Sequence, residues 1–186
     1  MSVSVLIRRR RSVFPKSYLP DAPIARQTLE FLLENANWAP THKLTEPWRF
    51  QVFHSAESRQ ALSDYLADYY HKHTPAEQFS AEKLRKTAEN PLRAGAVIAI
   101  VMRRHESLPE FEEVASVAMA VHNMWLTCAE LNLGAYWSTP KAAVEAGEWL
   151  GLAPEERCLG FFYLGWHQAP DLPGKRTPIS DKVIWR

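Results

Sequence analysis

The chain has 186 residues, of which 46% are hydrophobic and 23% are charged. This composition fits one globular domain over residues 1–186 with a sizeable core, and it excludes a disordered chain. The formal net charge is +1, from 22 basic and 21 acidic residues, so no global field directs the protein to nucleic acid or to an anionic membrane.

Neither a secretory signal nor a membrane span is predicted. The apolar start MSVSVLI is followed, not preceded, by basic residues, and it lacks a cleavage site. No apolar run approaches the roughly 20 residues that cross a bilayer. Cys128 and Cys158 lie in apolar segments without a CxxC pair, which favours buried thiols over a disulfide or a zinc site. We therefore expect a cytoplasmic protein with no metal and no membrane partner.

The first third of the chain predicts a helix, a strand and a second helix. Apolar residues recur at helical spacing over 24–39, where Pro40 disfavours continuation. Residues 49–54 alternate and are rich in Phe and Val, which is typical of a strand. Helical spacing returns over 56–73.

The middle third contains the strongest signals. A mostly solvated helix is predicted over 80–90, and the apolar run 94–102 predicts a strand covered on both faces, in the middle of a sheet. A broad apolar stripe over 110–131 predicts a long core helix. Three glutamates crowd its first turn, where the helix dipole favours negative charge, so we assign them a structural role: Glu110, Glu112 and Glu113.

The last third predicts a strand over 134–139, a helix over 141–151 and a buried strand over 158–166. This mixture of helices and strands indicates a layered sandwich of both. The tail, from about 168 to 186, is rich in proline, has no helical or strand period and ends in the apolar sequence KVIW. Such an arm needs a surface on which to dock.

Four common catalytic or nucleotide-binding patterns are absent: GxGxxG, GxxxxGK[ST], GxSxG and HExxH. The sequence therefore gives no support for a Rossmann or P-loop nucleotide site, an esterase elbow or a zincin helix.

Two basic clusters remain as candidate sites. The first, RRRRS, ends in Arg10, Arg11 and Ser12, and its guanidinium groups and hydroxyl match phosphate oxygens. A solvated basic terminus and a nucleic-acid arm are the alternatives, although no stacking aromatic residue is interleaved with the arginines. The second cluster, PGKR, contains Lys175 and Arg176. Both clusters could converge on one phosphate.

In their order along the chain, several short motifs resemble the nitroreductase family of FMN-dependent oxidoreductases. They are RRS before the first helix, APTHK and PWRF after it, the long helix leading into LGAYW, the strand FFYLGW and the basic tail. The resemblance covers essentially the whole chain and is closest to small members with APxHK.

The resemblance implies an α+β fold, a three-layer α/β/α sandwich with a mixed central sheet. It further implies a homodimer that binds two FMN molecules at its interface and exchanges C-terminal arms, which would bury KVIW on the partner.

Carried over by motif, one group of residues would bind the FMN phosphate and part of the flavin edge: Arg10, Arg11 and Ser12, with Arg176 and Lys175 reaching the same phosphate.

A second group would approach the flavin ring. Trp38 and His42 are expected to approach it, one from each subunit, while Trp137, Ser138 and Thr139 lie along the ring. The sequence NWAPTHKLTEPWRF would then be polar and aromatic because a flavin is a flat apolar ring with a hydrogen-bonding rim.

The chain departs from the family pattern at the pyrimidine edge, where many members have Asn and Gln before PW. Here these positions are Leu44 and Glu46. Glu46 could accept from the flavin N3–H or face solvent. A basic residue common in the family is replaced by Phe14, and Lys16 or Lys43 could supply that charge.

The resemblance implies transfer of a hydride from NADH or NADPH through FMN to an electron-poor acceptor, such as a nitroaromatic or a quinone. Trp38, Trp137, Phe14 and the tyrosines between Tyr65 and Tyr70 could wall the acceptor slot, although core packing is the alternative for the tyrosines. Two competing hypotheses are a non-catalytic FMN-binding storage or sensor module, and a specialised relative, which would need a lid for which this chain has little room.

Overall fold

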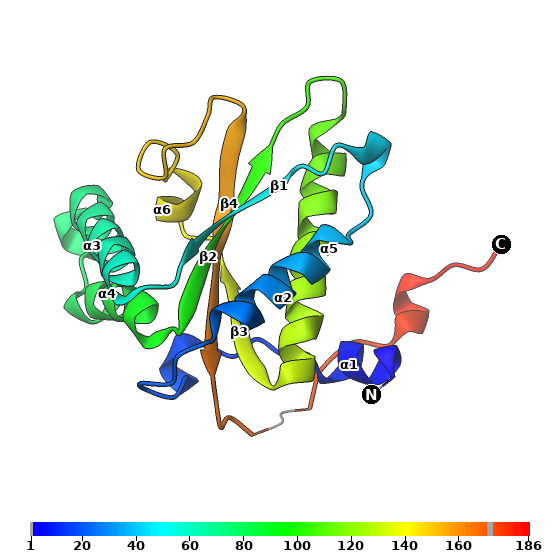
Figure 1. The fold of residues 1–186 in the computed structure, drawn as a ribbon, viewed down its shortest axis with the longest axis horizontal. Helices are drawn as coiled ribbons and strands as arrows, with labels where there is room; N and C mark the ends of the chain where they lie inside the picture. Colours follow the sequence, from blue (N-terminus) through cyan, green and yellow to red (C-terminus); the bar gives the residue numbers. More distant parts are fainter. Residues whose placement is uncertain (1, 171–172) are drawn as a thin grey trace.

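Four antiparallel strands, in the order β1-β2-β4-β3, form the centre of the computed structural model, which describes residues 2–170 and 173–186 (Figure 1). The strands are β1 (Trp48–Phe53), β2 (Ala96–Arg103), β3 (Leu133–Ser138) and β4 (Glu156–Trp166). In β2, seven of eight residues are buried, which confirms the predicted central strand.

The predicted mixed sheet is corrected: within the described residues every strand pair is antiparallel. The connection between β1 and β2 consists of α3 (Ala56–His73) and α4 (Ala81–Arg93), which pack against each other. This helical hairpin returns the chain to the same end of the sheet at which β1 stops, so β2 runs antiparallel to β1.

One face of the sheet is covered by α2 (Arg26–Asn37) and by the long α5 (Glu110–Leu131). Their apolar stripes pack on every second residue of β2, for example Ile98 and Ile100, because successive side chains of a strand point to opposite faces.

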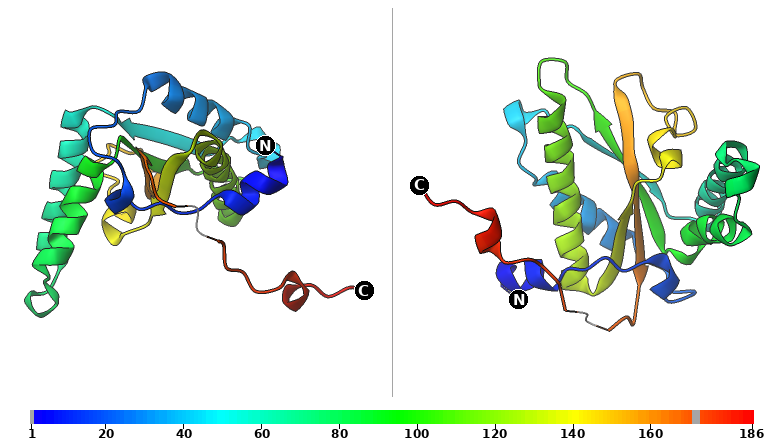
Figure 2. Two further views of the ribbon diagram at one scale, coloured as in Figure 1. Left: turned by 90° about the horizontal axis from the view of Figure 1, so that it is seen from below. Right: turned by 180° about the vertical axis from the view of Figure 1, so that it is seen from behind.

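The other face is covered by α3 and the short α6 (Lys141–Val144), with Val97 and Ala99 of β2 in its core, while α4 packs on α3. Figure 2 shows the sheet enclosed between these two helical layers. The fold is therefore the predicted α+β sandwich of three layers.

Several boundaries agree with the sequence predictions, and two differ. Helices α3 and α5 begin and end as predicted. The helix predicted over 141–151 stops at Val144, where Gly147 and the left-handed Gly151 (φ 65°) lie in the turns that follow. Helix α1 (Val3–Arg9) was not predicted, since its β-branched residues are weak helix formers.

Both ends of the chain expose apolar side chains. In α1, Val3, Val5 and Ile7 are exposed. Residues 173–186 are exposed throughout, and Figure 1 shows this tail leading away from the sheet. Among the described residues, no helix has the length and apolarity needed to cross a membrane.

Candidate functional site

The arginine cluster is fixed between α5 and the edge strand β3. The guanidinium carbon of Arg10 lies 4.7 Å from the centre of the Trp125 ring, a cation–π contact. The indole N–H of Trp125 donates to the Arg11 carbonyl over 3.2 Å, and the Val13 N–H donates to the Ala135 carbonyl over 3.0 Å. The segment that leaves α1 is thus held in a defined place.

The two basic clusters lie together. Partial burial lowers the pKa of Arg10, and the positive charges of Arg176 and Arg11 lower it further. Gly174 approaches Arg11 so closely that a β-carbon on it would lie 2.4 Å from the guanidinium. Within the described part of the chain, Arg10 has no carboxylate partner. A set of like charges in this arrangement is stabilised by an anion.

Not every predicted phosphate residue faces the same space. A cavity of about 330 Å³ beside the cluster is lined by Arg11 and Ser12, together with Phe14, Trp125 and His167 among others. Arg10 is not part of the lining. The side chain of Lys175 is exposed, and its carbonyl accepts from Arg176 over 2.6 Å.

The predicted ring residues of the APTHK segment lie at the opposite end of α5. His42 Nδ1 contacts the carboxylate of Glu112 in the first turn of that helix. Trp38 is 78% exposed and donates from its indole N–H to Glu34 over 3.0 Å. Both side chains are therefore held through a ring nitrogen, while much of each ring is exposed to solvent.

The loop between His42 and Pro47 has an unusual backbone. Lys43, Leu44 and Glu46 all have left-handed φ angles, of 50°, 55° and 43°. Such angles are uncommon outside glycine and concentrate at functional sites. Leu44 is 82% exposed, and Glu46 is exposed with its N–H donating to the Thr41 hydroxyl over 3.2 Å. The side chains that replace the family's Asn and Gln thus face outward.

The third predicted group stands at the end of β3. The indole N–H of Trp137 donates to the Leu159 carbonyl over 3.1 Å, and its ring lies against Gly160, where any side chain would collide with it. Ser138 and Thr139 follow, and Thr139 is exposed. Trp137 is therefore anchored by contacts with β4.

One chain does not bring all predicted residues together. Arg10 packs on Trp125, whereas His42 contacts Glu112, thirteen residues earlier in α5. At 1.5 Å per residue, the two groups lie about 20 Å apart along the helix.

Two contributors were missed by sequence reasoning. Trp125 was assigned to the core stripe, and Glu112 was assigned to the helix dipole, because helical periodicity does not reveal a contact across the fold. Among the described residues, no group of three or more His, Cys, Asp or Glu side chains could hold a metal ion.

Known proteins resemble this chain over nearly its full length. The model of the Nitroreductase family matches residues 7–166. YfhC of Bacillus subtilis (strain 168), whose name assigns it provisionally to the NAD(P)H nitroreductases, is 29% identical over 183 residues, which are 95% of this chain and 90% of YfhC.

Solved structures share the fold. A nitroreductase-like family protein from Bacillus cereus has a TM-score of 0.84 and 26% identity, over 100% of this chain and 96% of its own. A protein from Desulfovibrio desulfuricans, solved in complex with FMN, has a TM-score of 0.75 and 24% identity, over 100% of this chain and 97% of its own.

Proposed function

Because the chain belongs to the nitroreductase family, we propose that it is an FMN-dependent oxidoreductase that transfers electrons from NAD(P)H to an electron-poor acceptor. The observation that carries the proposal is the convergence of Arg10, Arg11 and Arg176 from the two ends of the chain.

The cluster fits the FMN phosphate by charge and by donor type. Arg10, Arg11 and Arg176 would neutralise the dianion, Ser12 would donate from its hydroxyl, and Lys175 would add charge from the exposed tail. The cation–π contact with Trp125 orients Arg10, so less freedom is lost when the phosphate binds.

The ring residues fit the flat body of FMN. Trp137 would lie along the ring with Ser138 and Thr139, while Trp38, His42 and Glu46 would approach it from the second subunit. The bound flavin would accept hydride from the nicotinamide and pass reducing equivalents to the acceptor. The chain itself would bind, orient and shield the reactants, so no side-chain nucleophile is required.

A homodimer would complete this site. The N-terminal half of α5 exposes three large apolar side chains, three and five residues apart: Phe111 (72% exposed), Val114 (37%) and Met119 (39%). Exposed apolar faces of this kind mark interfaces. If two α5 helices crossed antiparallel about a twofold axis, the His42 end of one subunit would meet the Arg10 end of the other.

The exposed tail supports arm exchange. Ile184 and Trp185 are 84% and 92% exposed. In the proposed arrangement the chain forms a single FMN-binding domain, and its arm, from about residue 168 onward, lies on the partner subunit and covers both side chains. Deletion of residues 179–186 should weaken the dimer, as measured by sedimentation equilibrium. An equally stable truncated dimer would refute the exchange.

The proposed acceptors are nitroaromatics or quinones, because the ring-lining residues offer aromatic surface near the flavin. A cytoplasmic location is supported by two free thiols, Cys128 and Cys158, both buried.

A visible absorption spectrum before and after anaerobic NADH or NADPH tests the proposal. Oxidised-flavin bands that bleach are expected. Bands that persist would favour a storage or sensor module, and a colourless protein that does not take up added FMN would refute the proposed function.

A further inference from the structure

A second cavity, of about 280 Å³, opens between the α3–α4 hairpin and the end of β3 with α6. Its lining includes Ser138 from the predicted flavin segment, so it adjoins the candidate flavin site. The remaining lining residues come mainly from the helical hairpin: Leu66, Tyr69, Tyr70, His73, Thr74, Lys83, Thr87 and Asn90. Their chemistry indicates what the cavity binds.

Tyr163 of β4 contributes to the lining of this cavity. Tyr163 of β4 is only 3% exposed, and its hydroxyl makes no hydrogen bond within residues 2–170 and 173–186. Burial raises the pKa of Tyr163 well above its ordinary value, so this hydroxyl stays protonated and can donate. A hydroxyl that lines the cavity and has no partner in the described protein is available to donate to a ligand oxygen.

The polar side chains around Tyr163 also favour an acceptor. Thr87 and Asn90 face the cavity from α4, and neither side chain hydrogen-bonds to the described protein. Lys83 has no ion-pair partner among those residues, and its ammonium lies 5.5 Å from the centre of the Tyr70 ring. No described Asp or Glu lines the cavity. These donors and this charge match an oxyanion.

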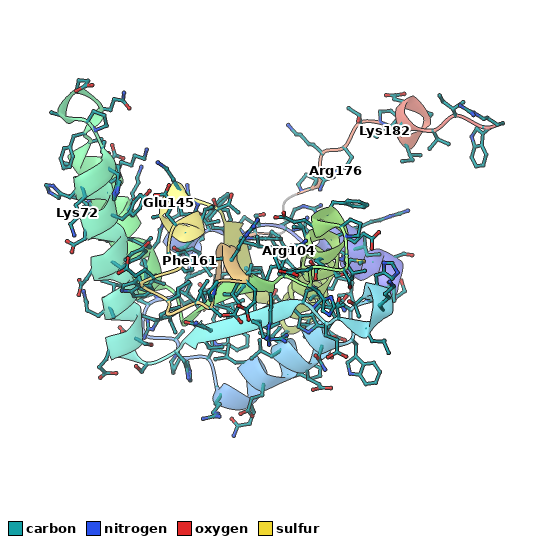
Figure 3. All side chains as sticks on the ribbon, turned by 90° about the horizontal axis from the view of Figure 1, so that it is seen from above. Lys72, Arg104, Glu145, Phe161, Arg176 and Lys182 are labelled. Atoms are coloured by element: carbon teal, nitrogen blue, oxygen red, sulfur yellow. The ribbon has the colours of Figure 1, made fainter. Side chains whose placement is uncertain are left out.

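A carboxylate that contacts two of the lining residues is already engaged. Glu145 accepts from the Tyr69 hydroxyl and lies 3.3 Å from the ammonium of Lys141. In Figure 3, Glu145 stands beside α6, across from the α3 helix that carries Lys72. Lys141 is therefore compensated, which leaves Lys83 as the cation that a ligand would neutralise.

The walls are aromatic. Tyr69 and His73 stack with their ring centres 4.0 Å apart, and Tyr70 contributes a third ring. Planar rings stack favourably on such surfaces. The cavity thus combines aromatic walls with a polar end of positive charge.

We propose that this cavity binds a planar aromatic carboxylate, with its anionic group directed to Tyr163, Asn90 and Lys83. Its position beside Ser138 makes such a compound the preferred acceptor, a role that rests on the proposed reductase function. Binding itself does not depend on turnover.

The test is calorimetric titration of the FMN-loaded, oxidised protein, without nicotinamide, using 4-nitrobenzoate and its neutral analogue 4-nitrobenzamide. The carboxylate should bind about tenfold more tightly than the amide, because a hydrogen bond to a charged group is stronger than one to a neutral group. Equal affinities would overturn the proposal.

Two variants locate the binding. Tyr163→Phe should weaken 4-nitrobenzoate binding about tenfold. Lys83→Gln, a surface change that leaves the core intact, should weaken it about threefold and reduce its dependence on salt. Lys86→Gln is the matched control, because Lys86 lies on the same helix, pairs with Glu82 and is not in the lining.

The outcomes separate the two proposals. Loss of carboxylate preference in Lys83→Gln, but not in Lys86→Gln, supports the cavity even if the flavin does not bleach with NAD(P)H. If the flavin bleaches but both ligands bind equally, the proposed carboxylate site is refuted while the reductase function is retained. Unchanged binding in both Tyr163→Phe and Lys83→Gln would also refute the carboxylate site.

Discussion

The two ends of α5 hold the two halves of the candidate flavin site, and they differ in charge and in backbone. At the C-terminal end, Arg10 lies over Trp125 and close to Arg176, in a positively charged cluster. At the N-terminal end, Glu112 contacts His42 beside a loop with left-handed residues. The first end is suited to a phosphate, and the second is suited to a ring with a polar rim.

The two ends are separated by about 20 Å along one helix. The proposed assignment of both ends to one flavin site therefore depends on a second subunit. Each end is nevertheless ordered by its own contacts. A second subunit could therefore join preformed halves, which lowers the entropic cost of assembling the site.

Met119→Glu should have the largest effect on FMN binding, because it would disrupt the proposed dimer interface that brings the two ends of α5 together. Met119 is 39% exposed in the middle of the apolar face of α5, and a twofold axis would bury the new charge twice. We expect the dimer to weaken by about 4 kcal/mol, roughly a thousandfold, with loss of FMN binding. Sedimentation velocity and flavin fluorescence measure both effects.

Ala61→Glu is the control, since Ala61 is exposed on α3, away from the proposed interface. A Met119→Glu protein that stays dimeric and yellow would show that α5 does not form the contact.

Glu113→Ala should have the next largest effect, confined to the acidic end. Glu113 is 1% exposed, pairs with Arg104 and accepts from the His105 N–H over 2.9 Å. Removing it leaves a mostly buried guanidinium without its carboxylate, so the free energy of unfolding should fall by about 3 kcal/mol. Urea denaturation measures this change.

Glu110→Gln on the same turn is the matched variant, because Glu110 is half exposed and pairs with Arg157 at the surface. It should cost less than about 1 kcal/mol. Equal losses in the two variants would contradict the assigned difference in burial.

Arg10→Ala tests the basic end. It should weaken FMN binding by about 1.5 to 3 kcal/mol, the value typical of a lost charge-assisted contact. Fluorescence titration of the apoprotein with FMN measures it, with Arg26→Ala on the exposed surface of α2 as control. Unchanged FMN affinity in Arg10→Ala would place the phosphate elsewhere.

The elements that the sequence predicted well are those with long periodic patterns. Helix α5 and strand β2 bury continuous or regularly spaced apolar residues, so their patterns need no knowledge of neighbours. Helix α1 was not predicted because its weak helix formers depend on packing for their conformation. The end of α6 was placed too late because Gly147 also depends on packing for its conformation.

The basic cluster, the family motifs and the aromatic loop were all visible in the chain, since residue type and order determine them. Only the tertiary structure decided which of them meet. It placed Arg176 with Arg10, held His42 on Glu112 at the far end of α5, and left the Tyr163 hydroxyl without a partner. The physical reason is that charge, burial and hydrogen bonding act through space between segments that are 70 residues apart for His42 and Glu112 and 166 apart for Arg10 and Arg176. Sequence periodicity reports only on neighbours along one helix or strand.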